Sequence, residues 1–188
     1  MNKSVIKTYL TSLYSYLETN TINEVAKCCD YLKLPKGTKL IQEGKRHPFF
    51  YIINRGCVKS YYQNEEKQIC SWFAFENEVI STMKSFDGQP SNETIKLLED
   101  SELIRFHTKS VKFLAESNIS VARLINKFII EHTEFLEELL YIKSKPSKER
   151  YDYFIIAEPQ LLQRVSLTDL ASFLGISRET LSRIRNKK

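Results

Sequence analysis

The hydrophobic period changes from helical to strand-like and back to helical along this chain of 188 residues, and this order constrains the fold more than any other feature. A helical period covers residues 4–20, where Ile6, Leu10, Leu13 and Leu17 fall on one face. A second short helix is expected near residues 22–30. From about residue 31 the helical period gives way to short apolar runs, which lie at residues 31–34, 38–41, 49–54, 57–62, 68–75, 93–98 and 103–106.

Turn-forming residues separate these short runs. Examples are Pro35-Lys36-Gly37 and Asn54-Arg55-Gly56, and four of the five glycines lie in such turns. Short strands at regular spacing, divided by turn signals, are typical of an antiparallel β sandwich or barrel. The middle of the chain is therefore predicted to form a compact β domain.

A long helical pattern follows at about residues 111–143. Within it, apolar positions recur in alternating steps of four and three residues, as in a coiled-coil seam. The seam positions are Val121, Ile125, Phe128, His132, Phe135 and Leu139, and a second stripe beside them holds Ala122, Ile129, Leu136 and Leu140. One stripe can pack on the chain's own β domain, whereas the other then needs a cover. We predict a homodimer through a parallel pair of helices; the alternative is one broad stripe packed inside a single subunit.

The charge of the chain is concentrated near its C-terminal end. Residues 1–142 hold 18 Lys and Arg against 18 Asp and Glu, whereas residues 143–188 hold 10 against 5. The whole net charge of +5 therefore lies in the last part of the chain. This asymmetry favours a polyanionic partner for that part. A solubilising surface is the alternative.

Residues 167–186 carry the most specific motif. Ser166 and Asp169 stand three residues apart, as in a helix-capping box, and Gly175 lies where the chain must turn before Ser177. The positions expected to be buried are Leu170, Ala171, Phe173, Leu174, Ile176, Leu181 and Ile184. This combination predicts two steeply crossed helices of the helix-turn-helix type.

The outer face of the second predicted helix carries side chains suited to reading bases. Arginine donates a fork of hydrogen bonds to guanine, and glutamate accepts from the amino group of cytosine. The base-reading candidates are Arg178, Glu179, Ser182 and Arg183. The candidates for phosphate contacts, which position a protein on DNA, are Thr168, Ser177, Thr180, Arg185 and Lys187. A solvated helix face is the alternative interpretation.

The succession of these parts resembles the cyclic-AMP receptor protein/FNR (Crp/Fnr) family of bacterial transcription regulators. Residues 175–184 are similar to the family's recognition element, and residues 50–59 and 99–103 look like parts of its β roll. The resemblance implies an α+β fold with three parts. These are an N-terminal antiparallel double-stranded β-helix (jelly-roll) domain of the cyclic-nucleotide-binding-like type at residues 1–110, a long dimerisation helix at 111–143 and a helix-turn-helix DNA-binding domain at 144–188. It also implies a homodimeric regulator on an inverted-repeat site, with Arg178, Glu179 and Arg183 as base readers.

The chain departs from the family at the positions that hold cyclic AMP. Cyclic-AMP binders carry a Gly-Glu-Leu segment and a later Arg-Ser/Thr pair, whereas residues 78–82 and 89–94 contain no aligned arginine. Glu93 stands near the place where an anion needs a cation, so we do not expect cyclic AMP to bind. The candidate effector pocket, for a neutral or cationic molecule, consists of Ile80, Ser81, Thr82, Ser91 and Asn92. The alternative is a β roll without a ligand.

The sequence lacks the motifs that are typical of enzymes, metal sites and membrane proteins. The sequence shows no nucleophile–base pair, metal-ligand spacing or glycine-rich phosphate loop, so we expect no enzyme, cofactor or metal site. Cys28 and Cys29 are adjacent, which is poor geometry for an iron–sulfur cluster. No stretch approaches the ~18 apolar residues of a membrane span, and residues 1–30 lack a signal-peptide core. We expect a cytoplasmic protein with no membrane partner.

The expected partners are double-stranded DNA, a second copy of the chain, RNA polymerase and a small-molecule effector of unknown identity. The alternative function is a ligand-binding sensor module of the cyclic-nucleotide-binding superfamily that acts through protein contacts. A steep fall of DNA affinity with salt distinguishes the two, because contacts to phosphates release counterions.

Overall fold

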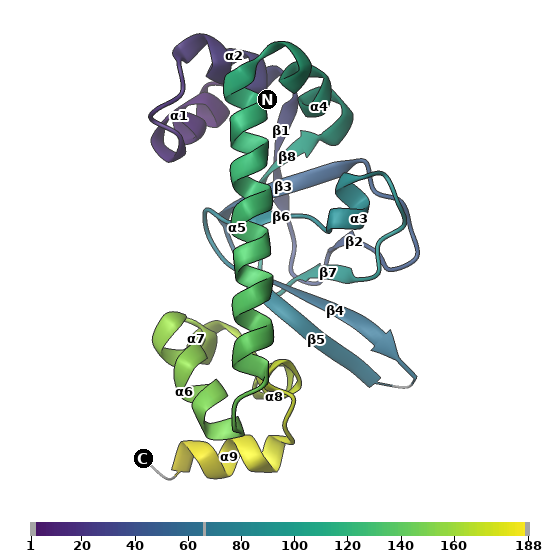
Figure 1. Cartoon of the computed structure of the whole chain (residues 1–188), viewed down its shortest axis with the longest axis vertical. Coiled ribbons are helices and arrows are strands. Elements are labelled where there is room, and N and C mark those ends of the chain that lie inside the picture. Colours follow the sequence, from purple (N-terminus) through teal and green to yellow (C-terminus); the bar gives the residue numbers. More distant parts are fainter. Residues whose placement is uncertain (1–2, 66, 187–188) are drawn as a thin grey trace.

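The computed structural model describes residues 3–65 and 67–186. The helices are α1 (Lys3–Leu13), α2 (Thr19–Lys27), α3 (Met83–Phe86), α4 (Thr108–Ser117), α5 (Ile119–Lys143), α6 (Ser147–Ala157), α7 (Leu161–Arg164), α8 (Leu167–Leu174) and α9 (Arg178–Asn186). The strands are β1 (Cys29–Leu34), β2 (Lys39–Ile41), β3 (Phe49–Arg55), β4 (Val58–Asn64), β5 (Lys67–Ala74), β6 (Val79–Ile80), β7 (Thr94–Leu97) and β8 (Ser101–His107). In Figure 1, α5 runs along the β domain, with α1, α2 and α4 at one end and α6–α9 at the other.

The β domain consists of two four-stranded antiparallel sheets. Their strand orders are β1-β8-β3-β6 and β2-β7-β4-β5. Side chains such as Ile53, Ile95 and Leu103, which are fully buried, fill the space between the sheets. The predicted fold class, an antiparallel β roll followed by a long helix and a C-terminal helical unit, is confirmed.

Strand β3 is apolar on both faces because both faces are covered. Tyr51 and Ile53 point into the core between the sheets, whereas Phe50 and Ile52 pack outward against the helices. An unbroken apolar run is typical of a strand buried on two sides, while a half-exposed strand alternates. The outer face of this sheet thus provides the surface on which α1, α2, α4 and α5 pack.

The long helix is shorter than its hydrophobic pattern predicts. Residues 111–143 were expected to form one helix, but the structure ends α4 at Ser117 and begins α5 at Ile119. The side chain of Asn118 accepts hydrogen bonds from the amides of Ser120 and Val121 and so caps the new helix. Asparagine competes in this way for backbone donors and favours a helix start over a helix interior.

Candidate DNA-binding unit and ligand cavity

The two crossed helices predicted from the sequence are α8 and α9. The Ser166 hydroxyl accepts a hydrogen bond from the Asp169 amide at 3.0 Å and caps α8. Gly175 ends α8 with a φ of 65°, a left-handed conformation that favours glycine. The inner faces of both helices are closed by side chains such as Leu170 and Leu181, which are buried. Local capping and turn residues therefore fix the geometry of this unit.

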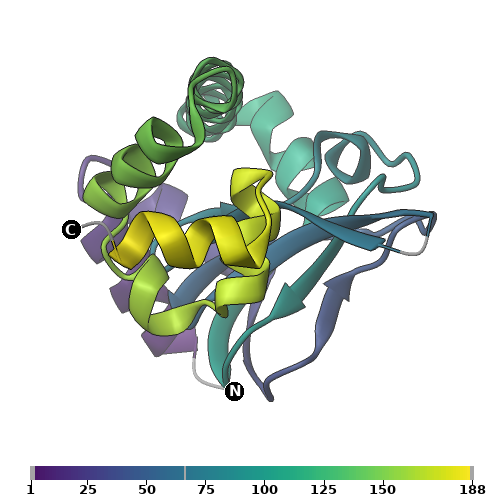
Figure 2. The same cartoon turned by 90° about the horizontal axis from the view of Figure 1, so that it is seen from below.

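The outer face of α9 presents the predicted base readers to solvent. Arg178, Glu179, Ser182 and Arg183 are all exposed. Arg183 donates to the Thr180 hydroxyl at 3.2 Å, but neither arginine forms an ion pair within the described residues. Figure 2 shows α9 lying across the lower end of the molecule, nearest the viewer. Both guanidinium groups are therefore available to a partner.

The predicted phosphate contacts fall into three groups. Thr168 and Arg185 are exposed. Ser177 is used locally, since its hydroxyl accepts from the Thr180 amide at 3.1 Å and lies 3.1 Å from the Thr180 hydroxyl. Lys187 lies outside the described residues.

The C-terminal helices are docked on the β roll. Helix α8 packs against β5, where the Cys70 amide donates to the Ser172 hydroxyl at 3.0 Å. The Phe73 and Phe173 rings meet edge to face with their centroids 5.4 Å apart. Lys59 of β4 also forms an ion pair with Asp169. The DNA-binding candidate is thus joined to the β roll by both apolar and charged contacts.

Arg164 provides the second charged contact between the two parts. Its guanidinium donates to both oxygens of Glu76, at 2.7 and 2.8 Å, and also pairs with Glu99. These hydrogen bonds hold the pKa of Glu76 at about 2, well below its ordinary value, with help from the Gly56 amide. Bidentate arginine–carboxylate pairs fix orientation as well as charge. The loop after β5 is therefore tied to α7.

The predicted dimer seam requires correction. Val121 and Leu139 are only 1% and 8% exposed and lie in two separate cores of the chain itself. The four positions between them, Ile125, Phe128, His132 and Phe135, face the same side and line a cavity. The stripe predicted to face a second copy faces the chain's own β roll instead. Both stripes of the helix are apolar, so their composition alone does not distinguish the inner stripe from the outer one.

The outer side of α5 carries the exposed apolar stripe instead. Ile129 and Leu136 of the second predicted stripe are partly exposed, and Leu140 is 71% exposed. Ile119, Ile130 and Tyr141 extend this surface. Exposed apolar side chains repeated along a long helix are typical of an interaction surface.

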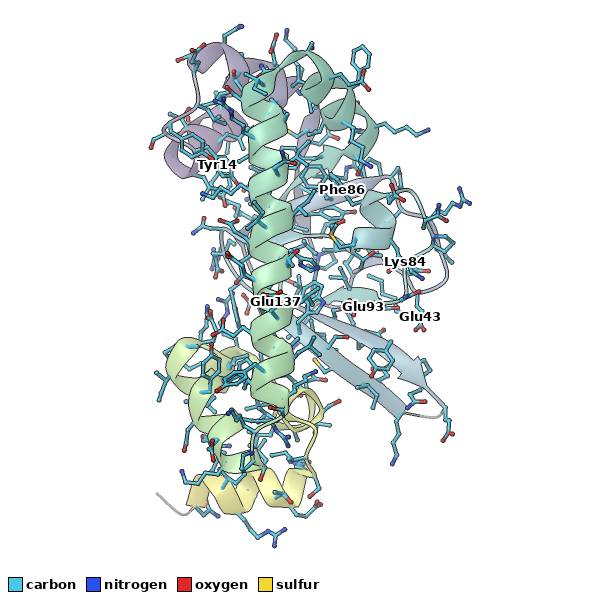
Figure 3. All side chains as sticks on the ribbon, in the orientation of Figure 1. Tyr14, Glu43, Lys84, Phe86, Glu93 and Glu137 are labelled. Atoms are coloured by element: carbon cyan, nitrogen blue, oxygen red, sulfur yellow. The ribbon has the colours of Figure 1, made fainter. Side chains whose placement is uncertain are left out.

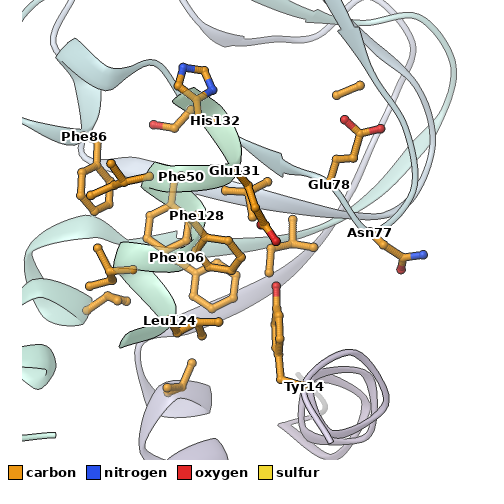
Figure 4. Close-up of a pocket in the computed structure, with 18 of the residues that line it drawn as sticks. Tyr14, Phe50, Asn77, Glu78, Phe86, Phe106, Leu124, Phe128, Glu131 and His132 are labelled. Atoms are coloured by element: carbon orange, nitrogen blue, oxygen red, sulfur yellow. The ribbon is translucent and has the colours of Figure 1, made fainter. Parts of the chain in front are cut away.

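A cavity of about 340 Å³ lies between α5, the N-terminal helices α1 and α2, and the outer face of the first sheet. Its walls are aromatic and aliphatic (Figure 4). The Phe50 and Phe106 rings stack at 4.8 Å with an interplanar angle of 4°, and Tyr14 meets Phe128 edge to face at 5.9 Å. This cavity occupies the space between the β roll and the long helix α5.

A few polar groups interrupt the apolar wall. Burial raises the pKa of Tyr14 and lowers that of His132, so both are neutral at pH 7. Glu78 sits recessed at the edge of the cavity yet accessible to water, and the surrounding protein atoms raise its pKa to about 7. Glu131 is the second acid at the wall.

The structure divides the predicted effector pocket. Ser81 and Thr82 line the cavity. Ile80, however, is fully buried between the sheets, and Ser91 is buried in a turn, where its hydroxyl donates to the Glu93 carbonyl at 2.7 Å. Asn92 is exposed and accepts from Lys84 at 3.0 Å. These five residues therefore do not form one pocket, because the strand and turn that carry them point their side chains in different directions.

Glu93 occupies a polar corner of the β roll. Its carboxylate accepts hydrogen bonds from the Ser60 hydroxyl at 2.6 Å and the Trp72 indole at 3.0 Å. Figure 3 shows Glu93 near Glu43 and Lys84, on the side of the molecule away from Tyr14. An acid held by two neutral donors offers no counter-charge to a phosphate.

Sequence reasoning missed the aromatic cavity. Its walls come from α1, α2, β3, β5, β6, α3, β8, α4 and α5, which are spread along most of the chain. The one signal for it was the unbroken apolar run of β3, which indicates a covered outer face but not a hollow one.

Two further findings concern metals and membranes. Within residues 3–65 and 67–186, no group of three or more His, Cys, Asp and Glu side chains is placed to hold a metal ion. In the same part of the chain, no helix combines the length and the apolar character needed to cross a bilayer.

Comparison with known proteins shows which families and structures this architecture resembles. Residues 31–118 match the family model of the cyclic nucleotide-binding domain. The search of curated proteins finds no match.

Solved structures share the fold at low sequence identity. FixK2 from Bradyrhizobium japonicum is 16% identical with a TM-score of 0.74, covering 85% of this chain and 83% of that one. A protein described as a transcriptional regulator of the crp/fnr family, from Eubacterium rectale, is 16% identical with a TM-score of 0.70, covering 93% and 85%. The Catabolite Activator Protein of Thermus thermophilus is 18% identical with a TM-score of 0.56, covering 93% and 85%. The likeness to Crp/Fnr regulators predicted from the sequence is confirmed at the level of the fold.

Proposed function

We propose that this chain, which carries a cyclic nucleotide-binding domain and has the fold of the Crp/Fnr regulators, is a DNA-binding transcription regulator. The observation that carries the proposal is the outer face of α9, where Arg178 and Arg183 are exposed and free of ion pairs within the described residues. The N-terminal end of such a helix is the part that enters the major groove. The positive charge of residues 143–188 supports the same interpretation.

The test is selection of a binding site from random duplex DNA, followed by affinity measurements on the enriched sequence. Arg178→Ala should weaken binding by about 1–3 kcal/mol and relax specificity at one position of the site. Arg46→Ala, which removes an exposed arginine from the loop between β2 and β3, is the matched control and should leave the affinity unchanged. No enriched motif, or equal losses in both variants, would contradict the proposal.

Arg185 should behave differently from Arg178. As a phosphate contact, it should contribute to all DNA sequences alike, so Arg185→Ala should lower affinity uniformly and reduce the salt slope by about 1. A sequence-dependent effect of Arg185→Ala would instead assign it to base reading.

The same proposal includes a homodimer formed through the outer stripe of α5. Two copies packed along this stripe would cover Ile130 and Leu140, which are 57% and 71% exposed in the single chain. Leu140→Glu should convert the dimer to a monomer in sedimentation experiments and abolish binding to an inverted repeat. Phe113→Glu, at an equally exposed position on α4, is the control and should remain dimeric. A monomeric parent protein would contradict this part of the proposal.

A further inference from the structure

The cavity beside α5 has the size of a ligand site. Its volume of about 340 Å³ lies at the lower end of the range of small-molecule pockets. The cavity is open to solvent beside Met83 and Phe135, which are 45% and 37% exposed, so a small molecule can enter it. The space is therefore suited to a molecule with roughly the bulk of two fused rings and a substituent.

The walls select for an apolar molecule. The stacked Phe50 and Phe106 rings form one side, and Phe128 with Tyr14 forms the opposite side. Figure 4 shows these rings grouped around the same space. Flat aromatic surfaces on facing walls favour a flat apolar ligand between them.

The charges at the cavity select against an anion. Its described lining contains no lysine or arginine, and its acids are Glu78 and Glu131. The nearby Lys112 lies outside the lining, with its ammonium 4.6 Å from the centre of the Phe86 ring, and is paired with Asp87. A phosphate or carboxylate in this space would therefore meet no cation, and Glu131 and the ionised form of Glu78 would repel it.

Two neutral polar groups are free to orient a ligand. Among the described residues, neither the Tyr14 hydroxyl nor the His132 ring has a hydrogen-bond partner, although both line the cavity. In Figure 4 the Tyr14 hydroxyl points into the space. A small number of polar groups in an apolar pocket is what fixes the orientation of a bound molecule.

We propose that this cavity binds an uncharged, predominantly apolar small molecule, flat enough to lie between Phe50 and Phe128, with a hydrogen-bonding group directed at Tyr14 and His132. Binding itself is independent of DNA. Only the use of this molecule as a signal rests on the proposed function as a regulator.

A pair of fluorescent probes tests the chemical class directly. N-phenylnaphthylamine is uncharged, and anilinonaphthalene sulfonate has the same rings with an added anionic group. With the full chain, the neutral probe should saturate at one molecule per chain and bind at least tenfold more tightly than the sulfonate. Equal affinity for the two probes would overturn the proposal, since it would indicate non-specific binding to exposed apolar surface.

Substitutions inside and outside the cavity locate the probe. Ile125→Trp fills the cavity and should weaken binding of the neutral probe at least tenfold, whereas Phe113→Trp places the same side chain at an exposed position of α4 outside the cavity and should change it less than twofold. If Ile125→Trp fails to fold by circular dichroism, Met83→Trp fills the space from an exposed position on the α3 side. Unchanged binding in the cavity-filling variant would overturn the proposal.

The remaining outcomes separate this inference from the proposed function. Probe binding that appears only in the monomeric Leu140→Glu variant would show that a second copy fills the cavity, and would overturn the ligand site. Loss of probe binding with DNA affinity retained would remove the ligand site alone. Probe binding retained in a protein that selects no DNA motif would support the ligand site and remove the regulator.

Discussion

Two segments of α5 are held by different kinds of contact, and they are called here the cavity half and the clamped half. The cavity half, residues 121–135, faces the hollow aromatic space beside the first sheet. The clamped half, residues 139–142, is buried in one core with β5 and the C-terminal helices, where Leu139 and Ile142 are 8% and 7% exposed. One half of the helix therefore has room to adjust, and the other has little.

This difference assigns the two ends separate mechanical roles. If the proposed ligand binds, we expect it to change the packing of α5 against the sheet, because that interface is incompletely filled. We expect the clamped half to pass the change on, because its core and the pair between Arg164 and Glu76 hold the C-terminal helices to both α5 and the β roll. Glu76 and the cavity residue Glu78 are two residues apart, so the two regions also meet in the segment after β5. A ligand in the cavity can shift the position of the C-terminal helices only if it binds one conformation of α5 more tightly than another.

The largest effect should come from breaking the clamped core. Phe173 is 4% exposed and contacts Phe73 and Phe154 edge to face, so Phe173→Ala should lower the free energy of unfolding by about 3–5 kcal/mol. Phe128 is half-buried and already borders the cavity, so Phe128→Ala should cost about 1–2 kcal/mol. Urea denaturation of both variants measures the difference. Equal losses would show that the two halves are packed alike.

A smaller loss should follow from removing the charged clamp. Arg164→Ala leaves Glu76 and Glu99 without their partner and should cost about 2 kcal/mol. The control is Lys148→Ala, which removes an exposed pair with Asp152 within one helix and should cost about 0.3–0.5 kcal/mol. Denaturation curves again provide the measurement, and a cost no larger than that of the control would show that the clamp is a surface pair only.

The two carboxyl groups after β5 should respond to pH in opposite directions. The pKa of Glu76 is lowered to about 2, so its stabilising contribution is present above about pH 4.5 and is lost as the pH falls towards 2. The pKa of Glu78 is raised to about 7, so the folded state holds its proton more tightly and stability falls as the pH rises from about 4.5 to 7.

Glutamine variants separate these contributions. Relative to the parent protein, Glu78→Gln should gain stability as the pH rises from about 5 to 7, whereas Glu76→Gln should lose most near neutral pH and least near pH 3. Unfolding free energies measured across this range provide the test. Parallel pH profiles for the two variants would contradict the assignment of the two environments.

The sequence predicted what local chemistry determines. Ser166 and Gly175 specify the start and end of α8 through their own backbone contacts, so the two-helix unit could be read from a short segment. The β roll was predicted from turn signals between short apolar runs. Asn118 was the equivalent signal for the break before α5, but the continuous apolar period around it obscured the cap.

The orientation of α5 and the cavity depend on tertiary contacts, which the hydrophobic period of the sequence does not predict. Two apolar stripes on α5 are equally good candidates for the inner face, and only the shape of the β roll decides that Val121 and Leu139 belong inside. The cavity is a gap between side chains from many elements, among them Leu10 of α1, Phe106 of β8 and Phe128 of α5, so no local pattern records it. The effector candidates do not meet for a related reason, since Ile80, the last residue of β6, lies between the sheets, whereas Ser81, which follows the strand, lines the cavity.

The smallest expected effect concerns two tyrosines near the cavity, Tyr9 and Tyr14, and the free energy of unfolding after each is changed to phenylalanine. The Tyr9 hydroxyl has two acceptors within reach for its one proton, the Ile53 carbonyl at 3.0 Å and the Asn77 Oδ1 at 2.9 Å, so Tyr9→Phe should cost about 1 kcal/mol of unfolding free energy. The Tyr14 hydroxyl has no partner among the described residues, so Tyr14→Phe should cost less than about 0.5 kcal/mol. The same tyrosine change is thus made twice on neighbouring parts of one fold, which cancels the effect of the substitution itself. If Tyr14→Phe is as costly as Tyr9→Phe, the hydroxyl has a structural partner and is not free for a ligand. If it is neutral to stability but weakens binding of the uncharged probe, its role lies in the cavity.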